Sequence, residues 1–151
     1  MKMIKMDTPQ CLLYSSAMVL DCEPSDLVTE IGHDGMEVCW PELEKPFCFR
    51  SFHPQEIMDC FVRRGYGFLV IDRKSFLGPD GVAPKEVVLD PNRIHAYMKN
   101  PGILVGCTKN GLPHAVAWDG KIIYDPNGYN YSREHFDITE FWCQVKLGAM
   151  P

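Results

Sequence analysis

The stretch that decides the fold of this chain runs from His114 to Asp125 and reads HAVAWDGKIIYD. An Asp-Gly pair between two apolar runs is typical of a β-hairpin closed by a two-residue type I′ turn. With Asp119 and Gly120 in the turn, the pairing places His114 directly opposite Asp125. Directly opposed side chains have Cβ atoms about 5 Å apart. We therefore expect the Asp125 carboxylate to hold the His114 imidazole by one ring nitrogen.

A histidine held in this way is half of a site for nucleophilic catalysis, and Cys11 is the candidate for the other half. Thr8 and Pro9 predict the start of a helix, with Thr8 as its cap, so that Cys11 stands in the first turn. A free thiol has a pKa of about 8.5, and a helix N-terminus together with a neighbouring imidazole favours the reactive thiolate. The expected chemistry is acyl transfer, with Cys11 attacking an amide, His114 moving the proton and Asp125 orienting His114.

The rest of the chain predicts an α+β domain, with helices first and an antiparallel sheet second. The run from Cys11 to Leu20 is apolar or small on every face, which is typical of a helix buried in the middle of a domain. Residues 33–52 are interpreted as a long ordered loop whose aromatic side chains cover the core. The patterns predict further helices over 26–31, 53–64 and 90–100, and strands over 68–71, 103–107, 112–119, 120–125 and 138–147.

Composition bounds the class of protein. At 151 residues with 46% hydrophobic side chains, the chain suits one globular domain over 1–151. Its net charge is −5 and no basic stripe is present, so we expect no nucleic-acid partner. The first residues lack the apolar core of a secretory signal, and no run approaches the roughly 18 apolar residues of a membrane span. We therefore expect a cytoplasmic protein without a membrane partner.

The seven cysteines contain no Cys-x-x-Cys pair, so neither a disulfide framework nor a four-thiolate zinc site is indicated. Apart from Cys11 they are interpreted as reduced, buried small side chains. Cys107 is a rival nucleophile, because a two-residue turn at Asn110-Gly111 would place it opposite His114. No metal or cofactor is expected, since the remaining histidines are interpreted as loop, capping or solvated residues: His33, His53, His95 and His135.

The order of these residues resembles that of papain-like cysteine peptidases, and within them the bacteriocin-processing peptidases that remove double-glycine leaders. The resemblance spans roughly residues 1–145 and rests on two blocks: Cys11 followed by Ala17-Met18-Val19-Leu20, and His114-Ala115-Val116-Ala117-Trp118 followed by Tyr124-Asp125-Pro126-Asn127-Gly128. It implies a papain-like fold in which Cys11 is the nucleophile, His114 the base and Asp125 the orienting carboxylate. The implied substrate is a peptide or isopeptide amide of a peptide or protein.

Two positions depart from the pattern of that family. Its oxyanion-stabilising glutamine stands about six residues before the cysteine, where this chain has Lys5. Gln10 directly precedes Cys11, so Gln10 and Lys5 are the two candidate side-chain donors to the oxyanion. The family also has glycine after the cysteine, where this chain has Leu12.

Because both departures lie where the scissile carbonyl would bind, two other functions stay open. One is a catalytically silent protein on the same fold, for example a bacterial or phage protein that binds a host partner; Lys5 and Leu12 favour it. The other keeps the chemistry but transfers the acyl group to an amine instead of water.

Overall fold

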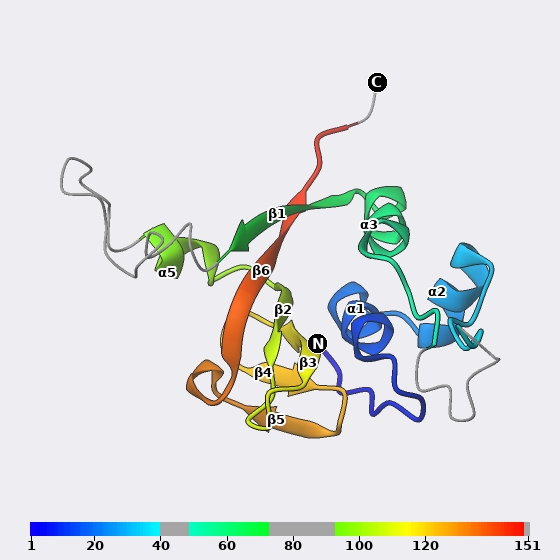
Figure 1. Ribbon diagram of the computed structural model, residues 1–151. Helices are drawn as coiled ribbons and strands as arrows, with labels where there is room; N and C mark the ends of the chain where they lie inside the picture. Colours follow the sequence, from blue (N-terminus) through cyan, green and yellow to red (C-terminus); the bar gives the residue numbers. More distant parts are fainter. Residues whose placement is uncertain (40–48, 73–92, 150–151) are drawn as a thin grey trace.

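The computed structural model describes residues 1–39, 49–72 and 93–149, which form a mixed α+β fold with an antiparallel sheet (Figure 1). The helices are α1 (Cys11–Leu20), α2 (Pro24–Ile31), α3 (Pro54–Arg63), α5 (Arg93–Tyr97) and a single 3₁₀ turn, η1 (Arg133–His135). The strands are β1 (Tyr66–Asp72), β2 (Gly102–Cys107), β3 (Pro113–Trp118), β4 (Ile123–Asp125), β5 (Tyr129–Tyr131) and β6 (Asp137–Lys146). The expected α+β architecture is confirmed.

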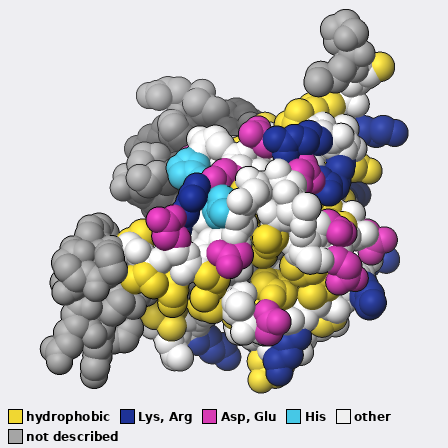
Figure 2. All heavy atoms as spheres, turned by 90° about the vertical axis from the view of Figure 1, so that its right-hand side faces the viewer, with side chains coloured by type: hydrophobic (Ala, Val, Ile, Leu, Met, Phe, Trp, Pro, Cys, Tyr) yellow, Lys and Arg dark blue, Asp and Glu magenta, His cyan; other side chains and the backbone are white. Residues whose placement is uncertain are grey.

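The sheet has the strand order β1-β6-β2-β3-β4-β5, and every neighbouring pair is antiparallel. Helices α1, α2 and α3 lie on one side of it, whereas α5 lies on the other side (Figure 1). Figure 2 shows the helix-bearing side of the molecule, where acidic and basic side chains are interspersed rather than gathered by sign. Among the described residues, no helix is both long enough and apolar enough to cross a membrane.

Helix α1 is the central element of the helical layer, as its composition predicts. All six residues from Leu13 to Met18 are buried, and the helix packs mainly on β3. A small residue of α1 faces the sheet, where Ser15 Oγ donates a hydrogen bond of 2.9 Å to the carbonyl of Ala115. The cluster between helices and sheet is built chiefly from Leu13, Ala17, Leu27, Ile57, Phe61, Ile103, Ala115 and Trp142.

A second hydrophobic cluster covers the other side of the sheet. Its members alternate along the strands with those of the first cluster, as the period-two geometry of a strand requires. Trp118 Nε1 donates a hydrogen bond of 2.8 Å to the carbonyl of Met98, which fastens the segment after α5 to this face. The cluster comprises Ile71, Met98, Leu104, Val116, Trp118, Ile123, Phe136, Phe141 and Cys143.

The predicted two-residue turn of the central hairpin is wrong. Trp118 pairs with Ile123, so four residues form the connection, and Asp119 Oδ1 accepts the N–H groups of Lys121 and Ile122. The register is thereby shifted by two residues from the expected one. Because side chains alternate with a period of two, this shift leaves His114 and Asp125 on the same face, as diagonal neighbours instead of directly opposed ones.

Other boundaries also differ from expectation. Gln10, not Thr8, is the N-cap of α1, and Cys11 is the first helical residue. The turn after β2 is longer than Asn110-Gly111, so Cys107 pairs with Pro113 while Gly106 pairs with His114; the placement of Cys107 opposite His114 is wrong. Strand β5 was not predicted. Parts of the expected 33–52 loop and 90–100 helix lie outside the described residues.

Candidate active site

Two neighbouring strands carry the site. His114 is the first buried residue of β3, and Asp125 is the last residue of β4. His114 Nε2 lies 2.8 Å from Asp125 Oδ1, and the two residues are only 7% and 5% exposed. A buried charge is costly unless it is paired and hydrogen-bonded. The expected His114–Asp125 contact is present, and because both groups are buried, each stabilises the charge of the other.

Asp125 also opens the turn that follows it. Its Oδ1 accepts the N–H of Asn127 at 2.8 Å, and its backbone carbonyl accepts the N–H of Gly128 at 2.8 Å. Gly128 has a φ of 97°, which favours glycine at that turn position. The Asp125 carboxylate thus stabilises the turn and binds the imidazole at the same time.

A third donor reaches Asp125 from the next strand. The Tyr131 hydroxyl donates a hydrogen bond of 2.7 Å to Oδ2. Burial raises the pKa of the Asp125 carboxyl, but the hydrogen bonds from His114, Asn127 and Tyr131 outweigh burial and hold that pKa below its ordinary value. The carboxylate is therefore ionised and fully engaged at neutral pH.

Cys11 completes the cluster from the first position of α1. Cys11 lies close enough to the His114 ring for each group to shift the pKa of the other, and the backbone N–H groups of Ala115 and Leu12 also favour the thiolate. Since Nε2 is taken by Asp125, Nδ1 is the ring nitrogen left for Cys11. The first hydrogen bond of the helix joins the Tyr14 N–H to the Gln10 carbonyl, so the N–H groups before Tyr14 precede the intrahelical ladder.

The pKa shifts of Cys11 and His114 run in opposite directions. Burial raises the pKa of the Cys11 thiol, but His114 and the N–H of Ala115 outweigh burial and lower the pKa below its ordinary value. Burial lowers the pKa of His114, but the bonds to Asp125 and Cys11 raise it to about 9. These are the shifts of a thiolate–imidazolium pair. The Phe136 ring covers the imidazole edge-on, with ring centroids 6.3 Å apart.

The two candidate oxyanion donors contact different segments of the chain. Gln10 is 6% exposed; its amide Nε2 donates to the Asp34 carbonyl, and its Oε1 accepts from Thr8 Oγ1 at 3.1 Å. Lys5 is exposed, and its aliphatic carbons lie beside Gly128 in the turn after Asp125. Their role as oxyanion donors stays a prediction, while the backbone N–H of Leu12 favours the Cys11 thiolate.

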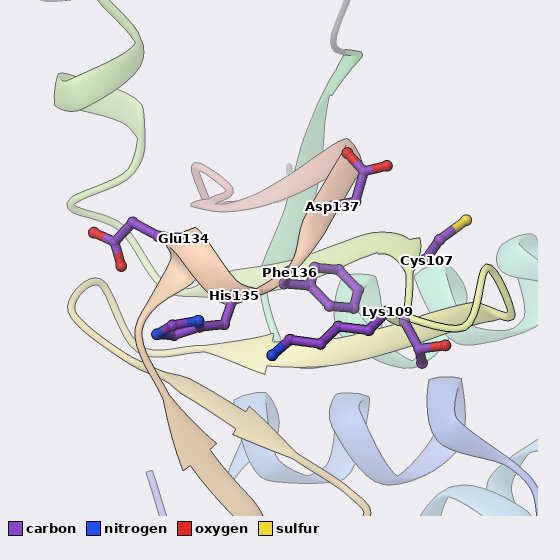
Figure 3. Close-up of a pocket in the computed structure, with 7 residues that line it drawn as sticks. Cys107, Lys109, Glu134, His135, Phe136 and Asp137 are labelled. Carbon is purple, nitrogen blue, oxygen red and sulfur yellow. The ribbon is translucent and has the colours of Figure 1, made fainter.

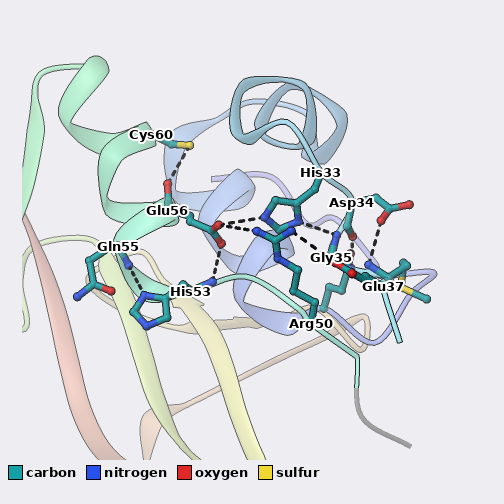
Figure 4. A network of polar contacts seen from close by, with 11 residues as sticks. His33, Asp34, Gly35, Glu37, Arg50, His53, Gln55, Glu56 and Cys60 are labelled. Carbon is teal, nitrogen blue, oxygen red and sulfur yellow. Dashed lines mark hydrogen bonds and ion pairs between the residues drawn. The ribbon is translucent and has the colours of Figure 1, made fainter. Parts of the chain in front are cut away.

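The loop that receives Gln10 is anchored on α3 by a polar network (Figure 4). His33 accepts the N–H of Gly35 through Nδ1 at 3.0 Å, and its Nε2 lies 3.1 Å from Glu56 Oε1. Arg50 lies 3.5 Å from the same carboxylate oxygen. Cys11 is therefore preceded by an N-cap residue held against an ordered loop. His53 caps α3 by accepting the N–H of Gln55, so His33 and His53 are loop and capping residues as predicted.

A groove borders the site beyond Asp125. Two adjoining pockets, of about 330 and 340 Å³, share the residues Thr108, Lys109, His135 and Phe136. The first also contains Cys107, and the second reaches Asp125 and Tyr131. In Figure 3, the Lys109 side chain runs beside the Phe136 ring in the direction of His135, while Glu134 and Asp137 point away. The groove thus ends at the face of Asp125 that Tyr131 occupies.

In the described ranges 1–39, 49–72 and 93–149, no group of three or more His, Cys, Asp or Glu side chains is arranged to hold a metal ion. The free thiols of those ranges include Cys11, Cys22, Cys60, Cys107 and Cys143, and burial raises the pKa of Cys60 to about 11. Burial also raises the pKa of Cys22 and Cys143, so the lowered pKa of Cys11 sets it apart from these thiols.

Sequence reasoning missed Tyr131 and Asn127. The signal was present in the run Asp125-Pro126-Asn127-Gly128, which predicts a tight turn, followed by the alternating residues of 129–131. A turn at that place creates a further hairpin and brings Tyr131 back toward Asp125. Searches with protein-family models and among curated proteins found no match to this chain.

Proposed function

We propose that this protein is a papain-like cysteine hydrolase that cleaves a peptide or isopeptide amide through Cys11, His114 and Asp125. The observation that carries this proposal is the buried His114–Asp125 pair, joined at 2.8 Å, with Cys11 beside the imidazole as the first residue of α1. Each of the three residues has the partner that its role requires, and the nucleophile stands at a helix N-terminus. The resemblance in residue order to papain-like peptidases points to the same chemistry.

The reaction follows from the positions of these groups. The Cys11 thiolate attacks the amide carbonyl carbon, and the carbonyl oxygen becomes an oxyanion that the N–H groups at the start of α1 are placed to receive. His114, as imidazolium, gives its Nδ1 proton to the leaving amine, and a thioester to Cys11 remains. Water then attacks the thioester, with neutral His114 accepting a proton, and releases the carboxylic acid and the thiolate. Asp125 keeps Nε2–H bound throughout.

Site-resolved alkylation with iodoacetamide at about pH 6 tests the proposal first. At that pH an ordinary thiol is only about 0.3% ionised. We expect Cys11 to react faster than the other six cysteines, and His114→Ala to slow it by about 10- to 100-fold, because burial then acts on the thiol without the opposing imidazolium. The measurement is the modified fraction of each cysteine against time, by mass spectrometry.

The matched control is His95→Ala, which removes an exposed histidine from α5 and should leave the Cys11 rate unchanged. Exposure of the wild-type protein to a degenerate peptide mixture, with Cys11→Ala in parallel, then tests for cleavage. A Cys11 that reacts no faster than the other thiols would overturn the hydrolase proposal, and the silent binding protein would take its place.

The pH dependence of hydrolysis is a second prediction. The active form needs the thiolate and the imidazolium together, so kcat/KM should be bell-shaped. Activity should be lost on the acid side as Cys11 is protonated, below the ordinary range of a thiol, and on the alkaline side near pH 9, where His114 loses its proton. A profile that still rises through pH 9, as for an isolated thiol, would contradict the ion pair.

A further inference from the structure

The Asp125 carboxylate is satisfied unequally at its two oxygens. Oδ1 receives two groups, the His114 ring nitrogen at 2.8 Å and the Asn127 N–H at 2.8 Å. Oδ2 receives the Tyr131 hydroxyl at 2.7 Å. Rotation about the Cβ–Cγ bond moves both oxygens together, so the contacts at Oδ1 and the contact at Oδ2 all resist it. The Tyr131 hydroxyl is the contact that restrains the carboxylate on the Oδ2 side.

We propose that Tyr131 is a positioning residue of the hydrolase: its hydroxyl locks the Asp125 carboxylate in the rotation that keeps His114 aligned with Cys11. This inference rests on the proposed function and assigns to it a fourth residue. The hydroxyl of Tyr131 binds Asp125, and its effect on Cys11 and His114 passes through that carboxylate. Its effect should therefore appear as a change in the protonation of the Cys11–His114 pair.

Strand pairing explains why this tyrosine is in reach. Asp125 pairs with Tyr129 and Ile123 pairs with Tyr131, so the pairing puts Tyr131 on the face shared by Ile123 and Asp125. It is a diagonal neighbour of Asp125, at a separation that a long aromatic side chain can span. The half-buried ring packs against the second hydrophobic cluster, which holds the hydroxyl in a constant place.

The surroundings of Oδ2 give the hydroxyl a second effect. Asp125 and Tyr131 together line the end of the groove that also contains Phe136 and His135. The Tyr131 hydroxyl occupies the hydrogen-bonding position at Oδ2, which water from the groove would otherwise fill. A charge-assisted O–H···O⁻ bond at this position is stronger than one between neutral groups. Burial and the bond to Asp125 also raise the pKa of Tyr131, so the phenol stays a donor at every working pH.

The test is Tyr131→Phe, which keeps the packed ring and removes only the hydroxyl. Tyr129→Phe is the matched control, since Tyr129 lies in the same strand but is 67% exposed. We expect Tyr131→Phe to slow Cys11 alkylation at pH 6 by about threefold to tenfold, because the looser carboxylate supports the imidazolium less well. With a cleaved substrate, kcat should fall, KM should hold, and the alkaline limb should move to lower pH. Tyr129→Phe should match the wild type in each measurement.

A double-mutant cycle separates positioning from a merely structural role. If Tyr131 acts through Asp125, Tyr131→Phe should add little to the slowing caused by Asp125→Asn. Additive effects, or a Tyr131→Phe protein that is less heat-stable but has an unchanged alkylation profile, would overturn the inference while leaving the hydrolase in place. Slow alkylation of Cys11 in the wild type would instead overturn the proposed function and this inference together.

Discussion

Replacing Asp125 with asparagine should reduce the rate of hydrolysis by about 10²- to 10⁴-fold, the largest effect expected of a nearly isosteric change in this protein. The new amide can still accept from His114 Nε2 and from the Asn127 N–H through Oδ1, so the turn and the ring orientation are retained. The negative charge is lost. Without it the pKa of His114 falls from about 9, because the bond to Asp125 is the largest contribution that raises it. The imidazolium that stabilises the thiolate is then scarce at neutral pH.

Two readouts check this result, kcat on a cleaved peptide and the alkylation rate of Cys11 at about pH 6, and both should fall. The control is Glu134→Gln, which removes one negative charge from an exposed position nearby. It should leave both rates unchanged, because an exposed charge acts weakly through solvent. An Asp125→Asn protein that is alkylated as fast as the wild type would show that Cys11 and His114 form their pair unaided.

Replacing Gly106 with alanine should destabilise the fold by more than about 4 kcal/mol, which corresponds to a fall in Tm of more than about 10 °C. An added Cβ would lie 2.0 Å from the backbone oxygen of Asp137 and 2.9 Å from Phe136 Cε1. A backbone atom cannot move aside by changing rotamer, so β2 and β6 would have to separate at the point where their register shifts. Gly106 also pairs with His114, so the strain falls directly beside the site.

Urea or thermal unfolding measures this effect. Gly148→Ala is the matched control, since the added Cβ would meet no described atom within 4 Å and the expected change is within about 0.5 kcal/mol. A Gly106→Ala protein that loses less than about 3 °C in Tm would contradict the close approach of the two strands.

Local physical chemistry made several elements predictable from the chain alone. Helix α1 followed from an unbroken run of apolar and small residues, and α3 from His53-Pro54 at its start. The end of α2 followed from Gly32, whose φ is 91°. Period-two alternation placed His114 and Asp125 on one face of a hairpin. The shared face is correct although the turn length was wrong, because a register shift of two residues leaves every side chain on the same face of the sheet.

Sequence-local patterns were weaker where a short loop could close in more than one way. The Asp-Gly pair predicted a two-residue turn, but the Asp119 carboxylate binds two N–H groups further on and stabilises a four-residue connection instead. For the same reason, the sequence placed Cys107 opposite His114, one position from its observed partner Pro113, and did not predict strand β5. In the observed register Trp118 and Ile123 pair directly, and both pack into the second cluster.

By itself, then, the sequence determined the class of fold, a buried helix beginning at Cys11, and a hairpin that carries a histidine and a carboxylate on one face. Only the tertiary structure decided that the Cys11 thiol meets the His114 ring, because about a hundred residues separate them and no local pattern measures that distance. It also decided that Tyr131 holds the far oxygen of Asp125 and that the Gln10 amide binds the Asp34 carbonyl. These contacts depend on how α1 packs on β3 and how β5 folds back on β4, and such packing is set by the whole core at once.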